Sequence, residues 1–260
     1  MTALLQLDAV TKRFGGVAAL SNVSFQVAEG EILGLIGPNG AGKTTLLNCI
    51  SGVHDLDGGS IAFDGKRITG LPPHQVARLG IGRTFQVVKP FASMTVRENA
   101  AVGALFGSAQ AHLAPKAAFA AADEVLELVG LAPKARLTVG SLTIPDRKRL
   151  EIARALATRP RLLLLDEVMA GLNPVEVDQA LEMVRKVLDG GTTIVLIEHV
   201  MRVVVGVCDR VIVLHMGQFL AEGTPDQVLQ DRGVIEAYLG EKYAERAARA
   251  AQPRGQGTEA

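Results

Sequence analysis

The sequence predicts an α/β fold, and three apolar stretches carry this prediction. Residues 32–36 are apolar and lead into a glycine-rich segment and a helical pattern. Residues 162–165 are leucines that precede two carboxylates, and residues 194–197 precede Glu198 and His199. Uninterrupted apolar runs of this kind are typical of parallel strands covered on both faces, and ligands bind at the carboxyl ends of such strands. We therefore expect a parallel sheet whose polar strand ends form a site.

The composition limits the classes to which the chain can belong. With 260 residues it is long enough for one large domain or for a core with a subdomain. Hydrophobic residues make up 48% of the chain and aromatic residues only 4%, so we expect a core of Ala, Leu, Val and Ile. The 27 basic and 27 acidic residues balance, which gives no bulk attraction to nucleic acid or to anionic lipid.

The sequence contains no segment expected to enter a membrane. Residues 1–8 lack the charged leader of a signal peptide, and no run of about 18 consecutive apolar residues occurs. Cys49 and Cys208 do not make a disulfide framework, and Cys49 is expected to be a buried thiol. We expect a cytosolic chain that reaches a membrane only through a partner.

The N-terminal part predicts a covered antiparallel pair. Apolar and polar residues alternate over residues 4–28, which indicates two strands with one buried face. Phe14 lies between them beside two glycines, either as a half-buried loop anchor or as a ring that stacks on a planar base.

The glycine-rich segment predicts a phosphate-binding loop. Residues 37–44 fit the pattern G-x-x-x-x-G-K-[ST] between the apolar strand and a helical stretch at residues 43–51. Glycines let backbone N–H groups turn toward phosphate oxygens, and the helix start adds its positive end. Lys43 would reach the β- and γ-phosphates, and the Thr44 hydroxyl would bind Mg²⁺. A tight glycine turn without function is the alternative, which the flanking strand and helix disfavour.

The middle of the chain changes from mixed to helical patterns. After a turn at residues 57–59, we expect a short strand at 60–65, a helix at 72–79 with proline near its start, and a short strand at 80–86 ending in Gln86. Thr95 is a plausible cap for a helix over residues 96–105, and a second helix is expected over 117–129 after a loose connection. A loop from Ser141 then feeds an amphipathic helix to residue 157, with Pro145 in its first turn.

The second half returns to alternating strands and helices. The strand at residues 162–166 delivers Asp166 and Glu167 to one edge, and such a buried pair is costly unless a cation or hydrogen bonds compensate it. Further strands are expected at residues 192–198, 209–214 and 217–222, and helices at 174–188, 225–229 and 234–239. From residue 244 onward the composition predicts a disordered tail.

In this order, the motifs resemble the nucleotide-binding subunit of ABC transporters from residue 4 to about residue 243. The resemblance covers the phosphate loop (37–45), the Q-loop (83–86), the signature segment (142–146) and its helix, the second nucleotide motif (162–166) with Glu167, the D-loop (170–173) and the switch histidine, His199. Residues 77–86, 91–99, 170–174, 197–201 and 234–240 are similar to one branch, the ATPase subunits of high-affinity branched-chain amino acid importers.

The resemblance implies a fold and its division. The expected fold class is α/β, a P-loop NTPase (RecA-like) core with an antiparallel β subdomain and a helical signature subdomain. The cassette would span residues 1–243, with the helical subdomain at about 87–155, followed by the tail at 244–260.

The resemblance also implies a role for each site residue. Phe14 would stack on adenine, Lys43 would neutralise phosphate charge, Glu167 would orient or deprotonate the attacking water, and His199 would contact the γ-phosphate and that water. The phosphates of ATP would be held by Gly37, Asn39, Gly40, Ala41, Gly42, Thr44 and Thr45. Thr44, Gln86 and Asp166 would coordinate Mg²⁺, which prefers oxygen ligands. Phosphoryl transfer depends mainly on positioning and charge stabilisation, so ATP hydrolysis without a covalent intermediate is expected.

The signature segment departs from the Leu-Ser-Gly-Gly-Gln pattern of the family. Thr143 keeps a hydroxyl for the opposite subunit's nucleotide, but Ile144 and Pro145 replace the glycines and Asp146 replaces glutamine. Pro145 has no backbone N–H to donate, and Asp146 would bring negative charge toward that nucleotide. We therefore expect a heterodimer in which this chain's ATP is hydrolysed while the partner's turns over slowly. A homodimer, or two working sites served by Thr143 and the helix dipole, is the alternative.

The implied partners are a second ATP-binding subunit, two integral membrane permease subunits and, indirectly, an extracytoplasmic substrate-binding protein, at the cytoplasmic face of the inner membrane. An ATPase of a lipid or polysaccharide exporter with the same cassette is the alternative. A non-transport ATPase acting on ribosomes or DNA is disfavoured by the single phosphate loop, the short insert and the balanced charge, and no nucleic-acid partner is expected. A small-molecule kinase would not need a signature helix or a switch histidine.

Overall fold

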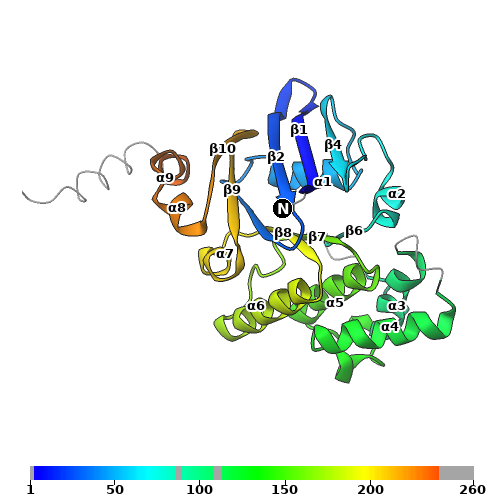
Figure 1. The fold of residues 1–260 in the computed structure, drawn as a ribbon. Helices are drawn as coiled ribbons and strands as arrows, with labels where there is room; N and C mark the ends of the chain where they lie inside the picture. The colour runs from blue at the N-terminus through cyan, green and yellow to red at the C-terminus, as the bar shows by residue number, and fades with distance from the viewer. Residues whose placement is uncertain (1–2, 86–89, 108–112, 240–260) are drawn as a thin grey trace, which may run out of the picture.

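The computed structural model describes residues 3–85, 90–107 and 113–239, and it has two sheets (Figure 1). The first sheet is antiparallel in the order β2-β1-β4-β5. Its strands are β1 (Ala3–Phe14), β2 (Val17–Ala28), β4 (Gly58–Phe63) and β5 (Lys66–Arg67). The antiparallel pair expected over residues 4–28 is confirmed, with Leu7 opposite Phe25 in its register.

The second sheet has the order β10-β9-β3-β8-β7-β6. Its strands are β3 (Ile32–Ile36), β6 (Ile81–Arg83), β7 (Leu162–Asp166), β8 (Thr193–Ile197), β9 (Arg210–His215) and β10 (Gln218–Gly223). All are parallel to their neighbours except β10, which is antiparallel to β9. Every residue of β3, β7 and β8 is buried, because both faces of this sheet are covered.

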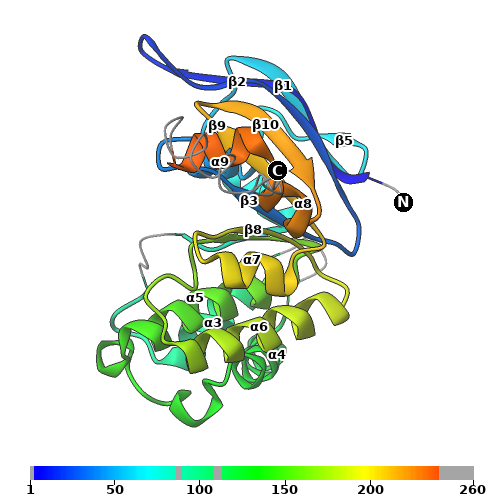
Figure 2. The same cartoon turned by 90° about the vertical axis from the view of Figure 1, so that its left-hand side faces the viewer.

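The helices form layers around the second sheet. They are α1 (Lys43–Ile50), α2 (Pro73–Arg78), α3 (Val96–Phe106), α4 (Pro115–Leu128), α5 (Ile144–Ala157), α6 (Pro174–Asp189), α7 (Met201–Val207), α8 (Pro225–Gln230) and α9 (Arg232–Leu239), with short 3₁₀ turns at Ala132–Lys134 and Val139–Ser141. Helices α3 to α7 lie on one side of β8 and the β1–β2 hairpin lies on the other (Figure 2). Alternate residues of β7 enter two separate hydrophobic clusters, Leu163 and Leu165 on the helix side, Leu162 and Leu164 on the side of α1.

Local sequence explains where the helices begin. The Thr95 hydroxyl accepts the Glu98 N–H, and the Glu98 carboxylate accepts the Thr95 N–H at 2.7 Å, so the expected cap is a full capping box. Pro145 lies in the first turn of α5, as expected. Asn173 and Glu176 form a second capping box at the start of α6.

The structure adds elements that the sequence did not predict. Helix α7 and the two-residue strand β5 were both missed. The run Met-Arg-Val-Val-Val-Gly-Val of α7 is short and rich in β-branched residues, which lowers its helix propensity. Gln86, residues 108–112 of the loose connection at 107–116 and the tail at 244–260 lie outside the described residues.

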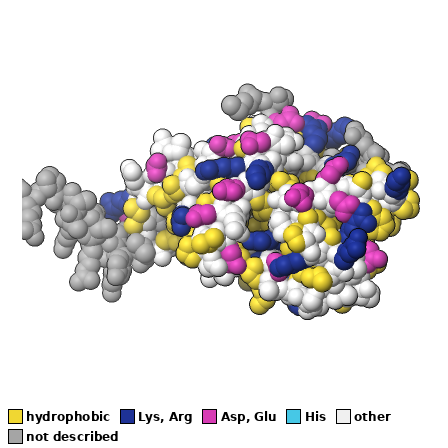
Figure 3. All heavy atoms as spheres, turned by 90° about the horizontal axis from the view of Figure 1, so that it is seen from below, with side chains coloured by type: hydrophobic (Ala, Val, Ile, Leu, Met, Phe, Trp, Pro, Cys, Tyr) yellow, Lys and Arg dark blue, Asp and Glu magenta, His cyan; other side chains and the backbone are white. Residues whose placement is uncertain are grey.

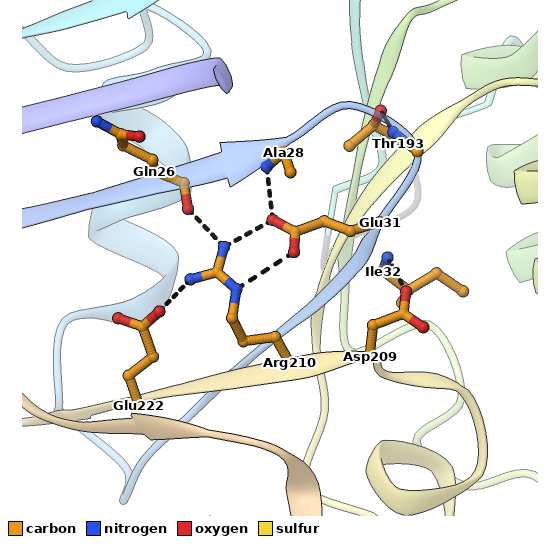
Figure 4. Close-up of polar contacts among 9 residues, drawn as sticks. Gln26, Ala28, Glu31, Ile32, Thr193, Asp209, Arg210 and Glu222 are labelled. Atoms are coloured by element: carbon orange, nitrogen blue, oxygen red, sulfur yellow. Dashed lines mark hydrogen bonds and ion pairs between the residues drawn. The ribbon is translucent and has the colours of Figure 1, made fainter. Parts of the chain in front are cut away.

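Arg210 joins the two sheets at one end. Its guanidinium binds the Glu31 carboxylate at 2.6 and 3.2 Å, the Glu222 carboxylate and the backbone carbonyl of Gln26 at 2.6 Å (Figure 4). Glu31 also accepts the N–H of Ala28 at 2.6 Å. The arginine at the start of β9 therefore ties the end of β2 and the edge strand β10 to the segment that enters β3.

The surface seen from below the helices is mixed. Cationic and acidic side chains alternate there with hydrophobic ones (Figure 3). Among the described residues, we find no helix whose length and apolar character would let it span a bilayer.

Candidate active site

The loop between β3 and α1 needs glycine for conformation and for space. Gly37, Gly40 and Gly42 have φ values of 147°, 79° and 98°. A Cβ on Gly37 would lie 2.1 Å from the carbonyl oxygen of Leu214, and one on Gly42 would lie 2.5 Å from that of Ala19. Side chains at these two positions would therefore displace the backbone of neighbouring elements.

A hollow of about 190 Å³ opens over this loop. It is lined by residues 39–45 together with Ala19 and Glu167. Seven of the sequence-predicted loop residues, from Asn39 to Thr45, therefore share one concave surface with Glu167, the predicted catalytic carboxylate that directly follows β7.

Lys43 is the buried cation of the hollow. Its side chain is at the start of α1, and its Nζ donates to the carbonyl oxygens of Gly37 at 2.7 Å and Pro38 at 3.1 Å. Burial lowers the pKa of Lys43, and the negative charges of Glu167 and Asp166 oppose that shift. The ammonium is thus held under the loop, beside two carboxylates.

Asp166 is buried at the end of β7, and the neighbouring groups compensate only part of the cost of burying its carboxylate. Its Oδ2 lies 3.4 Å from Nη2 of Arg83, and the Thr44 hydroxyl donates to the carboxylate. Burial raises the pKa of Asp166, and the positive charge of Arg83 opposes this. Its Oδ1 is buried and has no hydrogen-bond partner among the residues that the structure describes.

Arg83, the first residue of the Q-loop motif, has a role in the site that the sequence did not predict. It is the last residue of β6, and its Nη1 donates to Asn48 Oδ1 at 2.7 Å and to Ser51 Oγ at 2.8 Å, both on the α1 side. These bonds aim the guanidinium at Asp166. An arginine that ends an apolar strand is the only trace of this role in the sequence.

Glu167 and His199 meet because β7 and β8 are neighbours. Asp166 pairs with Ile197 in the parallel register, and the Glu167 N–H donates to the Ile197 carbonyl at 3.0 Å. Nε2 of His199 then lies 2.5 Å from Oε1 of Glu167. Glu167 has a φ of 52°, which is uncommon for a residue other than glycine and turns its side chain toward the loop.

Comparison with known proteins decides the family. A family model described as ABC transporter matches residues 20–170. The chain is 41% identical over 250 residues to the high-affinity branched-chain amino acid transport ATP-binding protein BraF of Pseudomonas aeruginosa, covering 92% of this chain and 98% of that protein. The chain belongs to the ABC transporter family. LivG of Escherichia coli, with the same description, is 42% identical over 92% of this chain and 98% of its own length.

Further similarities agree with this ABC family membership. A second model, described as branched-chain amino acid ATP-binding cassette transporter, matches residues 220–244. The ADP conformation of MJ1267, an ATP-binding cassette of an ABC transporter, superposes with a TM-score of 0.83 at 33% identity over 93% of this chain and 100% of that one. The dimeric cassette MJ0796 gives 0.78 at 26% identity over 85% and 98%. The expected P-loop ABC ATPase fold is confirmed, and the chain is an ABC-type ATPase.

The ABC signature segment differs from what its sequence predicts. Asp146 does not extend toward a partner: its side chain is buried, binds Nζ of Lys134 at 2.5 Å and accepts the Thr143 hydroxyl at 2.8 Å. Burial raises the pKa of Asp146, but the hydrogen bonds from Lys134 and Thr143 outweigh it and leave the pKa lowered. The expectation that Asp146 presents free negative charge is therefore wrong, because Lys134 from the preceding 3₁₀ turn neutralises it.

The remaining predicted residues lie outside the hollow. The Thr143 hydroxyl caps α5 by accepting the Asp146 N–H, and Ile144 exposes 74% of its surface at the helix start. Phe14 ends β1 and is about half exposed, and its ring centroid lies 5.2 Å from that of His54 in an edge-to-face arrangement. Neither Thr143 nor Phe14 lines the loop hollow, so their roles stay predictions.

Proposed function

We propose that this chain is the ATP-hydrolysing subunit of an importer of branched-chain or related amino acids. The proposal depends chiefly on the hollow in which the loop with Lys43 meets Glu167, whose carboxylate contacts His199. The amino acid substrate is supported by the relatives BraF and LivG and by the model that matches residues 220–244. The same relatives favour import over the export alternative.

The residues of this chain would divide the work of hydrolysis. The loop amides and Lys43 would hold the phosphates of ATP, and Phe14 would stack on adenine. Glu167, next to His199, would orient or deprotonate water for attack on the γ-phosphate, and His199 would contact that phosphate. Positioning and charge stabilisation account for most of such a reaction.

The oxygen atoms near Asp166 fit Mg²⁺. The buried, unpartnered Oδ1 of Asp166 and the Thr44 hydroxyl are hard oxygen donors of the type that Mg²⁺ prefers. Thr44, Asp166 and, as an expectation, Gln86 would hold the ion, which when bound offsets charge on the phosphates. Within the described residues there is no cluster of three His, Cys, Asp or Glu side chains, so part of the ligand set would come from ATP and water.

The proposed assembly contains other chains. A second ATP-binding subunit, two membrane permeases and an extracytoplasmic binding protein would complete the importer at the cytoplasmic face of the inner membrane. Dimer formation is supported by the dimeric cassette MJ0796. We propose residues 1–243 as the cassette, the segment at about 87–155 as its helical subdomain and 244–260 as a tail.

We further propose that the two ATP sites of the assembly are unequal. Pro145 removes a backbone donor, and the side chain of Ile144 occupies the exposed start of α5. The ATP faced by this segment would turn over slowly, whereas the chain's own loop and Glu167 would hydrolyse. Glu167→Gln here is expected to abolish transport, while the equivalent change in the partner subunit should reduce it less. Equal losses from the two changes would contradict the asymmetry.

Uptake measurements test the importer itself. The complete transporter is reconstituted in vesicles with ATP on the cassette side and the binding protein on the other, and radiolabelled leucine, isoleucine and valine are supplied. We expect ATP-dependent accumulation that Glu167→Gln abolishes while ATP binding is kept. ATP hydrolysis without uptake of any of these amino acids would contradict the proposed substrate class.

A further inference from the structure

The turn that follows β7 is held from two sides by the side chains of Lys148 and Glu198, to which the sequence assigned no individual role. From α5, Nζ of Lys148 donates to the carbonyl oxygens of Ala170 at 2.5 Å and Glu167 at 3.4 Å. From the end of β8, Oε1 of Glu198 accepts the N–H of Met169 at 2.8 Å. The turn is closed by its own bond from the Ala170 N–H to the Glu167 carbonyl at 3.3 Å.

The Glu198 carboxylate is buried, and its burial is energetically unfavourable. It is 1% exposed, and its Oε2 has no hydrogen-bond partner within the described part of the chain. Burial raises the pKa of Glu198, while the N–H groups of Met169 and His199 and the charge of Lys148 lower it. A buried charge that is only partly compensated is unfavourable, so a strand end with no further task would be expected to carry an apolar or hydroxyl residue here.

The turn at residues 167–170 includes a residue of the candidate active site. Glu167 begins the turn in a left-handed conformation, and its side chain reaches both the loop hollow and His199. His199 follows Glu198 directly in the sequence, and its backbone N–H lowers the pKa of the Glu198 carboxyl. One carboxylate therefore holds the backbone of the turn at Met169 and belongs to the residue that precedes His199.

Lys148 adds a connection to a different part of the fold. It lies on α5, two residues beyond the signature segment, and α5 packs with α3 and α4. A displacement of α5 would withdraw the ammonium from the Glu167 and Ala170 carbonyls, which would relax the turn from one side.

We propose that Lys148 and Glu198 are positioning residues that clamp residues 167–170, so that the placement of Glu167 against His199 depends on the position of helix α5. The clamp rests on the proposed catalytic role of Glu167 for its effect on turnover, but not for its effect on the turn. Through it, the helix that carries the signature segment sets the geometry of the chain's own hydrolytic site.

Paired variants of the full chain test this proposal. Lys148→Met and Glu198→Leu remove the contacts, whereas Lys148→Arg and Glu198→Gln keep a donor and an acceptor in place. Lys116→Met, an exposed lysine on α4, is the charge-matched control. Amide hydrogen exchange is measured on peptides covering 166–173 and 32–36, with ATP hydrolysis and ATP binding in parallel, in the presence of the transporter's other subunits.

We expect Lys148→Met and Glu198→Leu to raise exchange in 166–173 several-fold and leave 32–36 unchanged. The kcat for ATP should fall about tenfold or more while KM and ATP affinity stay within about twofold, because a catalytic group is misplaced and the phosphate loop is not. The Arg and Gln variants should recover most of both properties. The double variant should lose less than the product of the single losses, since both residues act on one turn.

Three outcomes would overturn the clamp. One is unchanged exchange in 166–173 in both breaking variants, a second is an equal rise in 32–36, and a third is failure of both conservative variants to recover either property. If exchange responds as expected but Glu167→Gln leaves hydrolysis intact, the clamp stands and the proposed role of Glu167 fails.

Discussion

At the scale of single residues, burial decides how each charged group of the site behaves. Lys43 and Asp166 attract each other electrostatically, and burial lowers the pKa of the first and raises that of the second. Burial makes the charged form of each side chain less favourable, and a neighbouring opposite charge stabilises that charged form. A polyanion on the loop supplies such a charge for Lys43, which predicts that this residue contributes strongly to ATP affinity.

The contribution of Lys43 to ATP affinity can be measured with a single substitution. Lys43→Ala should weaken ATP binding about 10- to 100-fold, because a hydrogen bond to a charged group is worth about 1.5–3 kcal/mol. Binding of ATP to the full chain is measured by calorimetry, with Lys116→Ala as the control for loss of surface charge. An affinity within twofold of the unmodified chain would show that Lys43 does not contact the phosphates.

The two cysteines give a pH-dependent prediction. Burial raises the pKa of Cys49 to about 11 and that of Cys208 to about 12. Because the thiolate is the reactive form, a pKa raised from about 9 to 11 lowers its fraction at pH 8 roughly 100-fold. A disulfide reagent should therefore label neither residue at pH 8 in the folded chain and both after denaturation. Rapid labelling of the folded chain would contradict the burial of these thiols.

At the scale of elements, the start of α3 can be tested in isolation from the site. Thr95→Ala removes the side-chain half of the capping box and should lower the free energy of unfolding by about 1 kcal/mol, whereas Thr95→Ser should retain most of it. Hydrogen bonds from Thr95 lower the pKa of Glu98. The contribution of Glu98 is therefore present above its unfolded-state pKa and lost as pH falls through the depressed value.

Urea unfolding at pH 7 and at pH 3 measures this cap. The difference between the Thr95→Ala variant and the unmodified chain should be smaller at the lower pH, because the Glu98 contribution is lost as the pH falls through its lowered pKa. A larger difference at pH 3 would mean that the carboxylate does not take part in the cap.

Elements that satisfy local rules could be predicted from the sequence, and those set by long-range contacts could not. The buried strands β3, β7 and β8 and the Thr95 cap each follow from a short pattern of residues. Helix α7 was missed because its valines favour a strand locally, while packing of Val203 and Val204 in the core makes it helical.

The same distinction applies to the site. The loop, Asp166, Glu167 and His199 belong to recognisable motifs, so they could be named in advance. Arg83 reaches Asp166 across 83 positions of sequence, and Glu198 binds Met169 across 29. The order of strands in the sheet brings such partners together, and that order cannot be read from the sequence. Asp146 was misjudged for the same reason, since Lys134 that neutralises it arrives from a separate turn.

At the scale of the whole molecule, the two sheets must keep a fixed relation, because the first sheet brings Ala19 to the hollow and the second brings the phosphate loop and Glu167. One hydrophobic cluster joins them around α1. Arg210 adds a polar junction at the end of the sheets, with contacts to β2, β10 and the residue before β3.

A comparison of Arg210 with Arg161 tests how burial changes the contribution of such ion pairs to the free energy of unfolding. Each binds two carboxylates, but the Arg210 side chain is 25% exposed and that of Arg161 is 43% exposed. Arg161 joins Glu29 and Asp64, whose own side chains are more than half exposed. Exposed pairs contribute about 0–1 kcal/mol, whereas removing one member of a more buried set leaves charges without partners.

We therefore expect Arg210→Met to lower the free energy of unfolding by about 2–3 kcal/mol and Arg161→Met by less than about 1 kcal/mol. Urea denaturation of the full chain, followed by circular dichroism at low and at high salt, measures both. High salt should reduce the loss of unfolding free energy caused by Arg161→Met and leave the loss caused by Arg210→Met nearly unchanged. Screening acts mainly on exposed charges. If the two variants lost equal stability, the junction at Arg210 would be no more than a surface ion pair, and the hydrophobic cluster around α1 would alone fix the first sheet over the phosphate loop.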